Sequence, residues 1–489
     1  MVVGKTIGWA LPVAALLAAC GGGGGTDVDG GGGGGPGLAI PTWSQRIEPF
    51  EPKAAALKGV AQGSTSSRAM AQAGATRVIA LAPLQRATPE RAAAAGSAAV
   101  PRQIGTARAV AETVDVARTA ALLPWRPTAR GTQVAALRFE SPGARGLRLG
   151  VLVQALPPGA VLRFHGAAPE DAVQLSAEQL QAVAERNASA GADATLARTY
   201  WSPDFGGAQT TLEVEIPEGA APAAVRLAVP RLSHFTSTAA EADLRTKAAV
   251  AGCLEDVSCH PDYLEQSRSV ARMTYVAEDG GAFYCTGTLL NDMAASGTPY
   301  FLSAQHCIPS QVVASTLVTD WLYRSASCNS AAENPASRRL TGGARLLYAS
   351  AGTDTAFMRL NDPLPAGVVY AGSYYGGVPI GTALASLHHA EGGLQSISLG
   401  SVLRYSNCGD ESCTATSGET GNYLALTWQQ GSTEGGSSGS GVFVTIGARR
   451  YLAGQLHGGS ASCARPDGTD YYGRFDLSYR AALKNWLNP

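Results

Sequence analysis

The sequence predicts a mostly β protein in three parts: a glycine-rich N-terminal tether, a β-sandwich-like module and a larger all-β C-terminal domain. Its 489 residues allow two or three domains, and its 59 glycines favour loops and strands over long helices. Apolar and polar residues alternate with period two in runs such as LEVEI at 212–216. Eight of the nine cysteines follow residue 252. The formal net charge of −1 gives no indication of a nucleic-acid partner.

The first 20 residues resemble the signal peptide of a bacterial lipoprotein. Lys5 precedes an apolar run at 7–19, which is too short to span a bilayer and suits a signal-peptide core. The run ends in Leu-Ala-Ala-Cys20, which resembles a lipobox, whose cysteine is lipidated after cleavage. We therefore expect an exported precursor attached to the outer membrane through lipid on Cys20. The alternative is an ordinary signal peptide followed by an unrelated cysteine.

Residues 21–45 form a glycine-rich linker that cannot bury a core and is predicted to be disordered. In residues 46–247, periodicity is weak at first and strands are predicted from about residue 130. Ser176 and Gln179 form a capping box that predicts a helix at 176–186. His165 and His234 are isolated, so we expect them to pack or to lie at the surface rather than to act in catalysis.

The C-terminal domain is expected at residues 248–489, after a polar and then small-residue seam at 241–252. Its eight cysteines in an exported chain predict four disulfides, with 105 possible pairings from the sequence alone. None belongs to a C-x-x-C pair, so we expect no structural zinc site, and no metal or other cofactor is predicted.

The stretch GGSSGSGVF at 435–443 contains two candidate nucleophiles. Ser437 fits the G-x-S-x-G pattern of the α/β-hydrolases, whose triad runs in the order Ser, acid, His. The only histidine after it is His457, and no Asp or Glu lies between the two. This order excludes an esterase of that type and leaves Ser438 as the candidate.

Ser438 has suitable partners upstream. His306 ends the apolar run in YFLSAQHC, and Asp354 precedes the apolar run in GTDTAFMRL. The order His, Asp, Ser is that of the chymotrypsin-type proteases, in which the imidazole takes the serine proton and the aspartate orients the imidazole. The glycines flanking Ser438 allow a tight turn, and we expect the N–H groups of Gly436 and Ser438 to form an oxyanion hole.

Several motifs in order resemble the lysyl endopeptidases, which are secreted bacterial serine proteases of the trypsin-like double-barrel fold. These motifs are CTGTLLN at 285–291, YFLSAQHC at 300–307, TEGGSSGSGVF at 433–443, GQLHGGSASC at 454–463 and DYYGR at 470–474. The resemblance covers about 248–489. It implies a monomeric endopeptidase that cuts proteins or peptides after lysine and uses His306, Asp354 and Ser438.

The resemblance also assigns further residues. It implies the disulfides Cys253–Cys463, Cys259–Cys328 and Cys285–Cys307, which leaves Cys408 and Cys413 to pair with each other. The lysine-binding acid maps to Asp470, with Asp467 as the alternative. His457 maps beside the substrate cleft, although it could be a plain strand residue, and Gly458 and Gly459 would let a peptide backbone approach. The chain departs from the family in one respect: the loop before Ser438 holds Tyr405, Cys408 and Cys413 where we expect a tryptophan.

Counting back from Cys253 as in the family puts the mature N-terminus at Ala248, directly after Lys247. A lysine-specific protease could cut that bond in its own precursor, which would release a cell-surface or secreted enzyme from the tether at Cys20. Residues 46–247 would then be a pro-region. The alternatives are a lipid-anchored binding or adhesion protein with an inactive protease domain, and a protease that prefers arginine.

Overall fold

The computed structural model describes residues 44–52, 76–84, 101–238, 253–409 and 412–489. The predicted signal peptide with Cys20, most of the glycine-rich linker and the predicted cleavage site at Lys247–Ala248 lie outside the described residues. Within the described ranges, no helix combines the length and the apolar character needed to cross a membrane.

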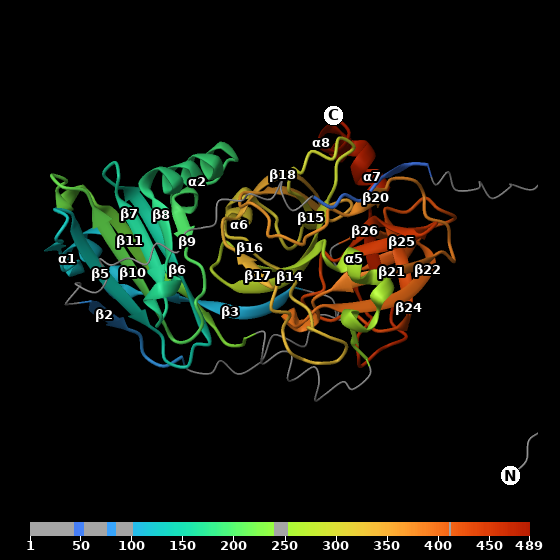
Figure 1. The fold of residues 1–489 in the computed structure, drawn as a ribbon, viewed down its shortest axis with the longest axis horizontal. Coiled ribbons are helices and arrows are strands. Elements are labelled where there is room, and N and C mark those ends of the chain that lie inside the picture. Colours follow the sequence, from blue (N-terminus) through green and yellow to red (C-terminus); the bar gives the residue numbers. More distant parts are fainter. Residues whose placement is uncertain (1–43, 53–75, 85–100, 239–252, 410–411) are drawn as a thin grey trace, which may run out of the picture. The chain divides into compact units, whose positions relative to one another are not determined.

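The N-terminal domain is a β-sandwich, as predicted. One sheet contains β2 (Arg77–Ala80), β4 (Arg126–Pro127), β5 (Gln133–Glu140), β7 (Val161–His165), β8 (Val173–Ser176) and β10 (Gln209–Ile216). The facing strands are β3 (Arg102–Ala109), β6 (Gly146–Ala155), β9 (Thr199–Trp201) and β11 (Arg226–Phe235). Alternate residues such as Leu137, Leu149 and Leu212 form the core between them. Figure 1 shows this domain in blue and green.

The α-helices in the described part of the N-terminal domain are α1 (Val116–Leu122), α2 (Ala177–Ser189) and α3 (Ala194–Ala197). The capping box at Ser176 and Gln179 forms as predicted and begins α2. Regular strands start earlier than residue 130, because β2 and β3 pair with strands distant in sequence. The alternation of apolar and polar residues within β2 and β3 is too short to predict these strands from the sequence.

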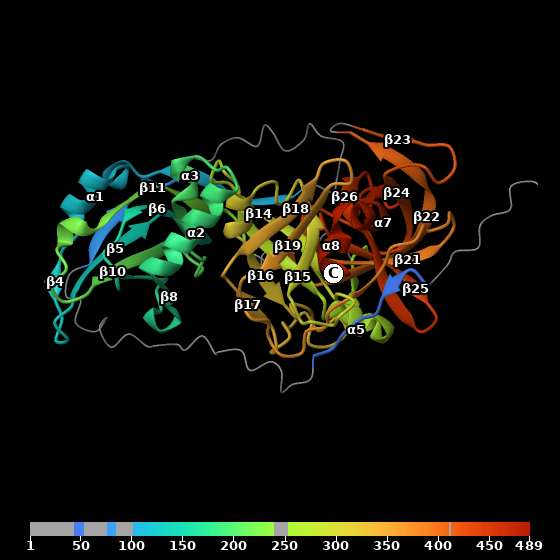
Figure 2. The same ribbon diagram turned by 90° about the horizontal axis from the view of Figure 1, so that it is seen from above.

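The C-terminal domain has two β-barrel halves, which confirms the predicted chymotrypsin-like double barrel. The first contains β13 (Val270–Val276), β14 (Ala282–Leu290), β15 (Tyr300–Ala304), β16 (Val318–Trp321), β17 (Arg338–Leu340), β18 (Ala344–Ser350) and β19 (Thr355–Leu360). The second contains β20 (Gly372–Tyr374), β21 (Ala383–His388), β22 (Ser396–Cys408), β23 (Cys413–Ala415), β24 (Tyr423–Gln430), β25 (Gly441–Ile446), β26 (Arg449–Gly459) and β27 (Asp470–Arg474). It closes because β26 pairs with both β25 and β27. Figure 2 shows the two groups of strands from above.

Shorter elements complete the C-terminal domain. The strand β12 (Glu255–Asp256) pairs with β22, and β1 (Arg46–Ile47), from the start of the chain, pairs with β20. The helices are α5 (Leu264–Ser267), α6 (Gln311–Ser315), α7 (Phe475–Ser478) and α8 (Lys484–Leu487).

Strand β3 joins the two domains in one sheet. It pairs antiparallel with β11 of the sandwich on one side and with β14 of the first barrel on the other. Gly105 lies where β3 meets both neighbours, and a Cβ there would meet Phe235 at 2.8 Å and Ala282 at 3.0 Å. The strand therefore needs glycine at this position to pack between the domains.

In the described part of the chain, the cysteines form the disulfides that the resemblance implied. The bridges are Cys253–Cys463, Cys259–Cys328, Cys285–Cys307 and Cys408–Cys413. The first ties the beginning of the domain to a loop 210 residues later, whereas the last closes a hairpin between residues only 5 apart.

Candidate active site

His306 and Asp354 lie together where two neighbouring strands meet. β15 ends two residues before His306, and β19 begins one residue after Asp354, with Ala304 opposite Thr355. His306 Nδ1 lies 2.6 Å from Asp354 Oδ2, and the His306 backbone N–H donates to Asp354 Oδ1 at 2.9 Å. The register of the two strands thus sets the contact between the side chains, and the carboxylate bonds both the imidazole and the backbone of His306.

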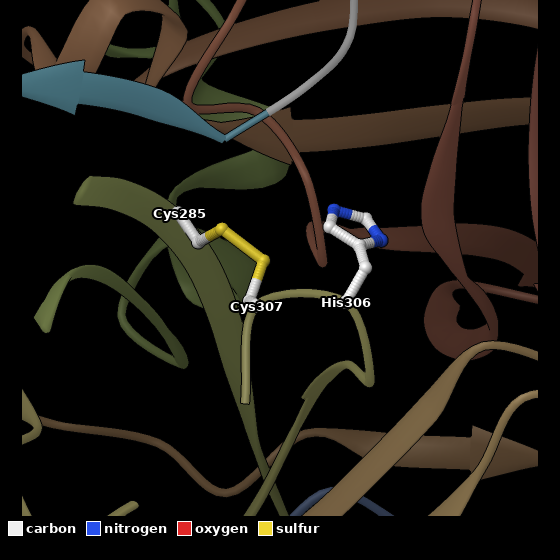
Figure 3. Close-up of side chains that lie close together, drawn as sticks. All are labelled: Cys285, His306 and Cys307. Atoms are coloured by element: carbon white, nitrogen blue, oxygen red, sulfur yellow. A yellow bond between two sulfur atoms is a disulfide. The ribbon is translucent and has the colours of Figure 1, made fainter. Parts of the chain in front are cut away.

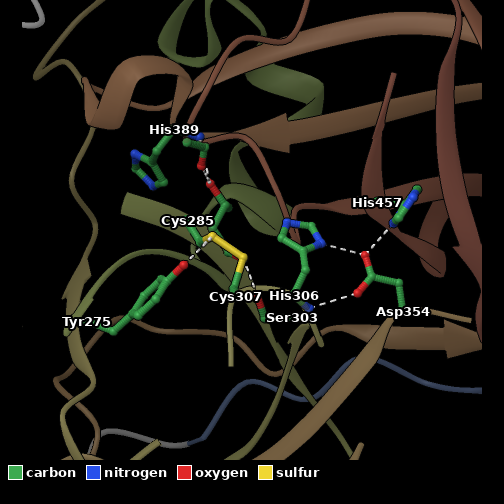
Figure 4. Close-up of a disulfide and its surroundings, with 10 residues drawn as sticks. Tyr275, Cys285, Ser303, His306, Cys307, Asp354, His389 and His457 are labelled. Atoms are coloured by element: carbon green, nitrogen blue, oxygen red, sulfur yellow. Dashed lines mark hydrogen bonds and ion pairs between the residues drawn. A yellow bond between two sulfur atoms is a disulfide. The ribbon is translucent and has the colours of Figure 1, made fainter. Parts of the chain in front are cut away.

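Asp354 also accepts a hydrogen bond from a second imidazole. His457 Nδ1 lies 2.7 Å from Asp354 Oδ2, and Figure 4 shows both histidines directed at the one carboxylate. Burial alone would raise the pKa of Asp354, but the two imidazoles outweigh it and lower this pKa to about 2. The carboxylate is therefore ionised at neutral pH, and His457 belongs to the same cluster as His306.

Ser438 lies in a tight turn packed against the end of β15. The residue is buried, and its carbonyl accepts a hydrogen bond from the Thr286 backbone N–H at 2.8 Å. The next residue, Gly439, has a φ of +80°, and a Cβ there would collide with Ser303 Oγ. Glycine is needed at this position both for its backbone conformation and for the close approach to β15. Ser303 is three residues before His306, so the turn lies next to the histidine-bearing segment.

Gly436 shapes the other side of the turn. Its φ is +94°, and its carbonyl accepts from Thr286 Oγ1 at 2.9 Å. Within the described residues, no backbone carbonyl accepts from the Gly436 N–H. This backbone group meets one requirement for an oxyanion-hole donor, since it is not used in a backbone pair of the protein itself.

Ser437 has different surroundings from Ser438. Its hydroxyl lies 2.9 Å from His388 Nδ1 and accepts from the Glu434 backbone N–H at 3.2 Å. The other ring nitrogen of His388 contacts Ser398 Oγ at 3.0 Å, and burial lowers the pKa of His388 to about 3. Sequence reasoning missed this neutral, fully buried network, because its members are distant in the chain.

Asp470 is completely buried at the start of β27. Its Oδ2 accepts from Trp428 Nε1 at 2.8 Å and from Thr433 Oγ1 at 2.5 Å. Its Oδ1 has no hydrogen-bond partner within the described residues. Burial raises the pKa of Asp470 to about 6, although the Thr433 and Trp428 side chains and the Ala461 backbone N–H oppose the shift. The carboxylate is thus buried and only partly neutralised by donors of the protein, and it could accept a further hydrogen bond from a cation such as an ammonium group.

Gly459 borders the Asp470 carboxylate, whereas Asp467, the alternative lysine-binding acid, lies at the surface. A Cβ at Gly459 would collide with Asp470 Oδ1, so a side chain there would cover the unpartnered oxygen. Gly458 has a φ of +157° and precedes it in β26. Asp467 is exposed, in contrast to Asp470. Sequence reasoning missed Trp428 and Thr433 as partners of Asp470, although Thr433 begins the quoted TEGGSSGSGVF string.

Two disulfides flank the histidines. Cys285–Cys307 lies beside His306, as Figure 3 shows. The Sγ atoms of Cys408 and Cys413 and a ring nitrogen of His457 lie within 4.8 Å of one another. This small bridge therefore lies beside His457, which shares Asp354 with His306.

Comparisons with known proteins agree on one family. Residues 248–473 match the family model for the lysyl endopeptidase C-terminal domain, and residues 78–236 match that for the lysyl endopeptidase N-terminal domain. A lysyl endopeptidase from Pseudomonas aeruginosa is 32% identical over 376 residues, which is 73% of this chain and 76% of the relative.

Two solved structures are also similar to part of the chain. One is the thermostable serine protease AL20 from an extremophilic microorganism, with 13% identity and a TM-score of 0.32. The other is the MamO protease domain from Magnetospirillum magneticum, with 9% identity and a TM-score of 0.30. Each match covers 45% of this chain and 98% of the other chain.

Proposed function

Because the chain belongs to the lysyl endopeptidase family and is a serine endopeptidase, we propose that it cuts peptide bonds after lysine through His306, Asp354 and Ser438. The observation that carries the proposal is the contact between His306 Nδ1 and the ionised Asp354. It fixes the tautomer in which Nε2 is the basic nitrogen. That Nε2 is buried and makes no hydrogen bond within the described residues.

The chemistry follows from this arrangement. His306 Nε2 takes the Ser438 hydroxyl proton as Oγ attacks the carbonyl carbon of the scissile bond, and Asp354 stabilises the imidazolium. The N–H groups of Gly436 and Ser438 donate to the oxyanion. The imidazolium then gives its proton to the leaving amine, and water hydrolyses the acyl-enzyme by the same steps.

Asp470 supports a preference for lysine. An ammonium group that reaches its unpartnered Oδ1 would neutralise a buried carboxylate, whereas a neutral side chain would leave that oxygen without a donor. The exposure of Asp467 makes it the weaker candidate for this role. Gly458 and Gly459 would let the substrate backbone approach β26 beside Asp470.

We further propose that the protein is made as a precursor. The disulfides are consistent with export. Lipid on Cys20 would hold the precursor at the outer membrane, the N-terminal domain would act as a pro-region, and cleavage between Lys247 and Ala248 would release the protease as a monomer.

Replacing Ser438 by Ala tests the mechanism. We expect turnover to fall by about 10⁶-fold and labelling by a fluorophosphonate probe to be lost. Ser437→Ala is the matched control: it removes a neighbouring hydroxyl of the same turn and should keep its activity, with a loss in stability of about 1 kcal/mol. An active Ser438→Ala protein, or an inactive but folded Ser437→Ala protein, would contradict the assignment.

A further inference from the structure

Strand β3 of the N-terminal domain lies against the edge of β14 that leads into the active site. Arg102 is opposite Tyr284 and Gly105 is opposite Ala282. Two residues beyond Tyr284, the Thr286 backbone N–H donates to the Ser438 carbonyl at 2.8 Å. An extended segment in the place of β3 therefore reaches the nucleophile turn along a continuous strand edge.

The direction of β3 identifies which part of a substrate could take its place. β3 is antiparallel to β14, and its residue numbers increase away from the active site, from Arg102 to Ala109. A substrate peptide bound in the same direction as β3 would run from the active site toward the C-terminus of the peptide. The separation of Tyr284 from Thr286 is about 7 Å at a strand rise of about 3.3 Å per residue. The position of Arg102 thus corresponds to one of the first few residues after the scissile bond.

At that position Arg102 forms an ion pair with Glu391. Arg102 Nε lies 3.0 Å from Glu391 Oε2, and the carboxylate side chain is 24% exposed. The Glu391 backbone N–H donates to the Gly435 carbonyl at 2.6 Å, which attaches this residue to the nucleophile turn. At the next residue, the Gly392 carbonyl accepts a hydrogen bond from Arg272 Nη1 at 2.7 Å. Glu391 is therefore held in place by the C-terminal domain itself.

The surroundings of Glu391 also favour a cation. Glu434 lies near it and is partly buried. Burial raises the pKa of Glu434, and the charges of Glu391 and Asp470 add to the shift, whereas the Cys463 backbone N–H and the charge of Arg102 oppose it. Without Arg102, the carboxylates beside the nucleophile turn would lack this counter-charge.

We propose that Glu391 is a second specificity determinant of the protease, which binds a basic side chain at one of the first three positions after the scissile lysine. Arg102 occupies this subsite in the precursor, and a substrate occupies it once β3 has left. The substrate would add to β14 as an extended strand, with its backbone hydrogen bonds giving affinity and Glu391 giving selectivity. This inference rests on the proposed function.

Peptides with a single lysine test the inference on the mature protease. Arginine is placed in turn at each of three positions before and three positions after the lysine, and each peptide is compared with its glutamine counterpart. Mass spectrometry counts only cleavage after lysine. We expect arginine to raise kcat/KM about two- to fivefold at one position after the lysine, because the ion pair is partly exposed. The gain should shrink at high salt.

Glu391→Gln should abolish the gain while cleavage of the glutamine peptides continues. Glu419→Gln, which changes an exposed acid of the same domain, should leave the gain intact. Equal rates for arginine and glutamine at all three later positions of the wild-type enzyme would overturn the inference, as would a gain that survives in Glu391→Gln. Failure of the proposed function would look different, since no peptide would then be cut after lysine.

Discussion

Replacing Asp470 by Asn removes a buried charge and keeps the shape of the side chain. The amide carbonyl can still accept from Trp428 and Thr433, the two donors that now hold Oδ2. The amide nitrogen then takes the place of Oδ1, which has no partner in the described part of the chain. A lysine ammonium that reaches this position would meet an N–H donor instead of a carboxylate.

The magnitude follows from the complete burial of this carboxylate. Removing one partner of a buried, hydrogen-bonded charge pair costs about 2–5 kcal/mol, largely because the other charge is left unpaired. At 1.4 kcal/mol per tenfold change, kcat/KM after lysine should fall by about 30- to 4,000-fold. Cleavage after a neutral side chain of similar length gains no ion pair from Asp470 and should change little.

The assay compares kcat/KM for two peptides that differ only in lysine or methionine before the scissile bond. Asp467→Asn is the matched control, since it removes a nearby exposed acid. A lysine-to-methionine ratio that is unchanged in Asp470→Asn would refute the assignment, and a ratio that falls only in Asp467→Asn would transfer the role to that residue.

The raised pKa of Asp470 adds two pH effects with a definite sign. Because this pKa is about 6, Asp470 becomes neutral below that pH in the free enzyme, and the lysine-to-methionine ratio should fall as pH drops through 6. When folding raises the pKa of an acid, the folded protein loses stability as the pH rises from the pKa in the unfolded chain to the pKa in the folded chain. Above pH 6, Asp470→Asn should therefore unfold at a higher temperature than the wild type, with a gain on the order of 3 kcal/mol from about two pKa units. An unchanged melting temperature at pH 8 would contradict this.

Three further results are expected. Lys247→Gln should prevent maturation at residue 248, and N-terminal sequencing that still finds Ala248 would exclude self-cleavage after lysine. Gly459→Ala should raise KM for lysine peptides, because its methyl group would collide with Asp470 Oδ1 and with the backbone of Thr469 and Asp470 and so displace the carboxylate; an unchanged KM would show that lysine binds elsewhere. Removing the Cys408–Cys413 bridge should cost less stability than removing Cys253–Cys463, because it closes a loop of 5 rather than 210 residues. Equal losses in chemical denaturation would contradict this ranking.

The sequence predicted the structural features that depend on neighbouring residues or on several family motifs in a fixed order. The capping box at Ser176 needed only neighbouring residues, and the disulfide pairing followed from the family resemblance. The contact between Ser437 and His388 and that between Arg102 and Glu391 could not be predicted in this way. Each joins residues that are adjacent only after distant strands have paired.

The location of β3 inside a continuous sheet determines what its departure would leave behind. Withdrawal of the strand from β14 opens an unpaired edge on each domain, and such edges are templates for association with other chains. On the barrel, Arg272 stacks over Tyr284 at the newly opened edge. On the sandwich, the open edge would be β3 itself. If the proposed cleavage occurs, we expect the liberated N-terminal fragment to self-associate through this edge or to be degraded quickly.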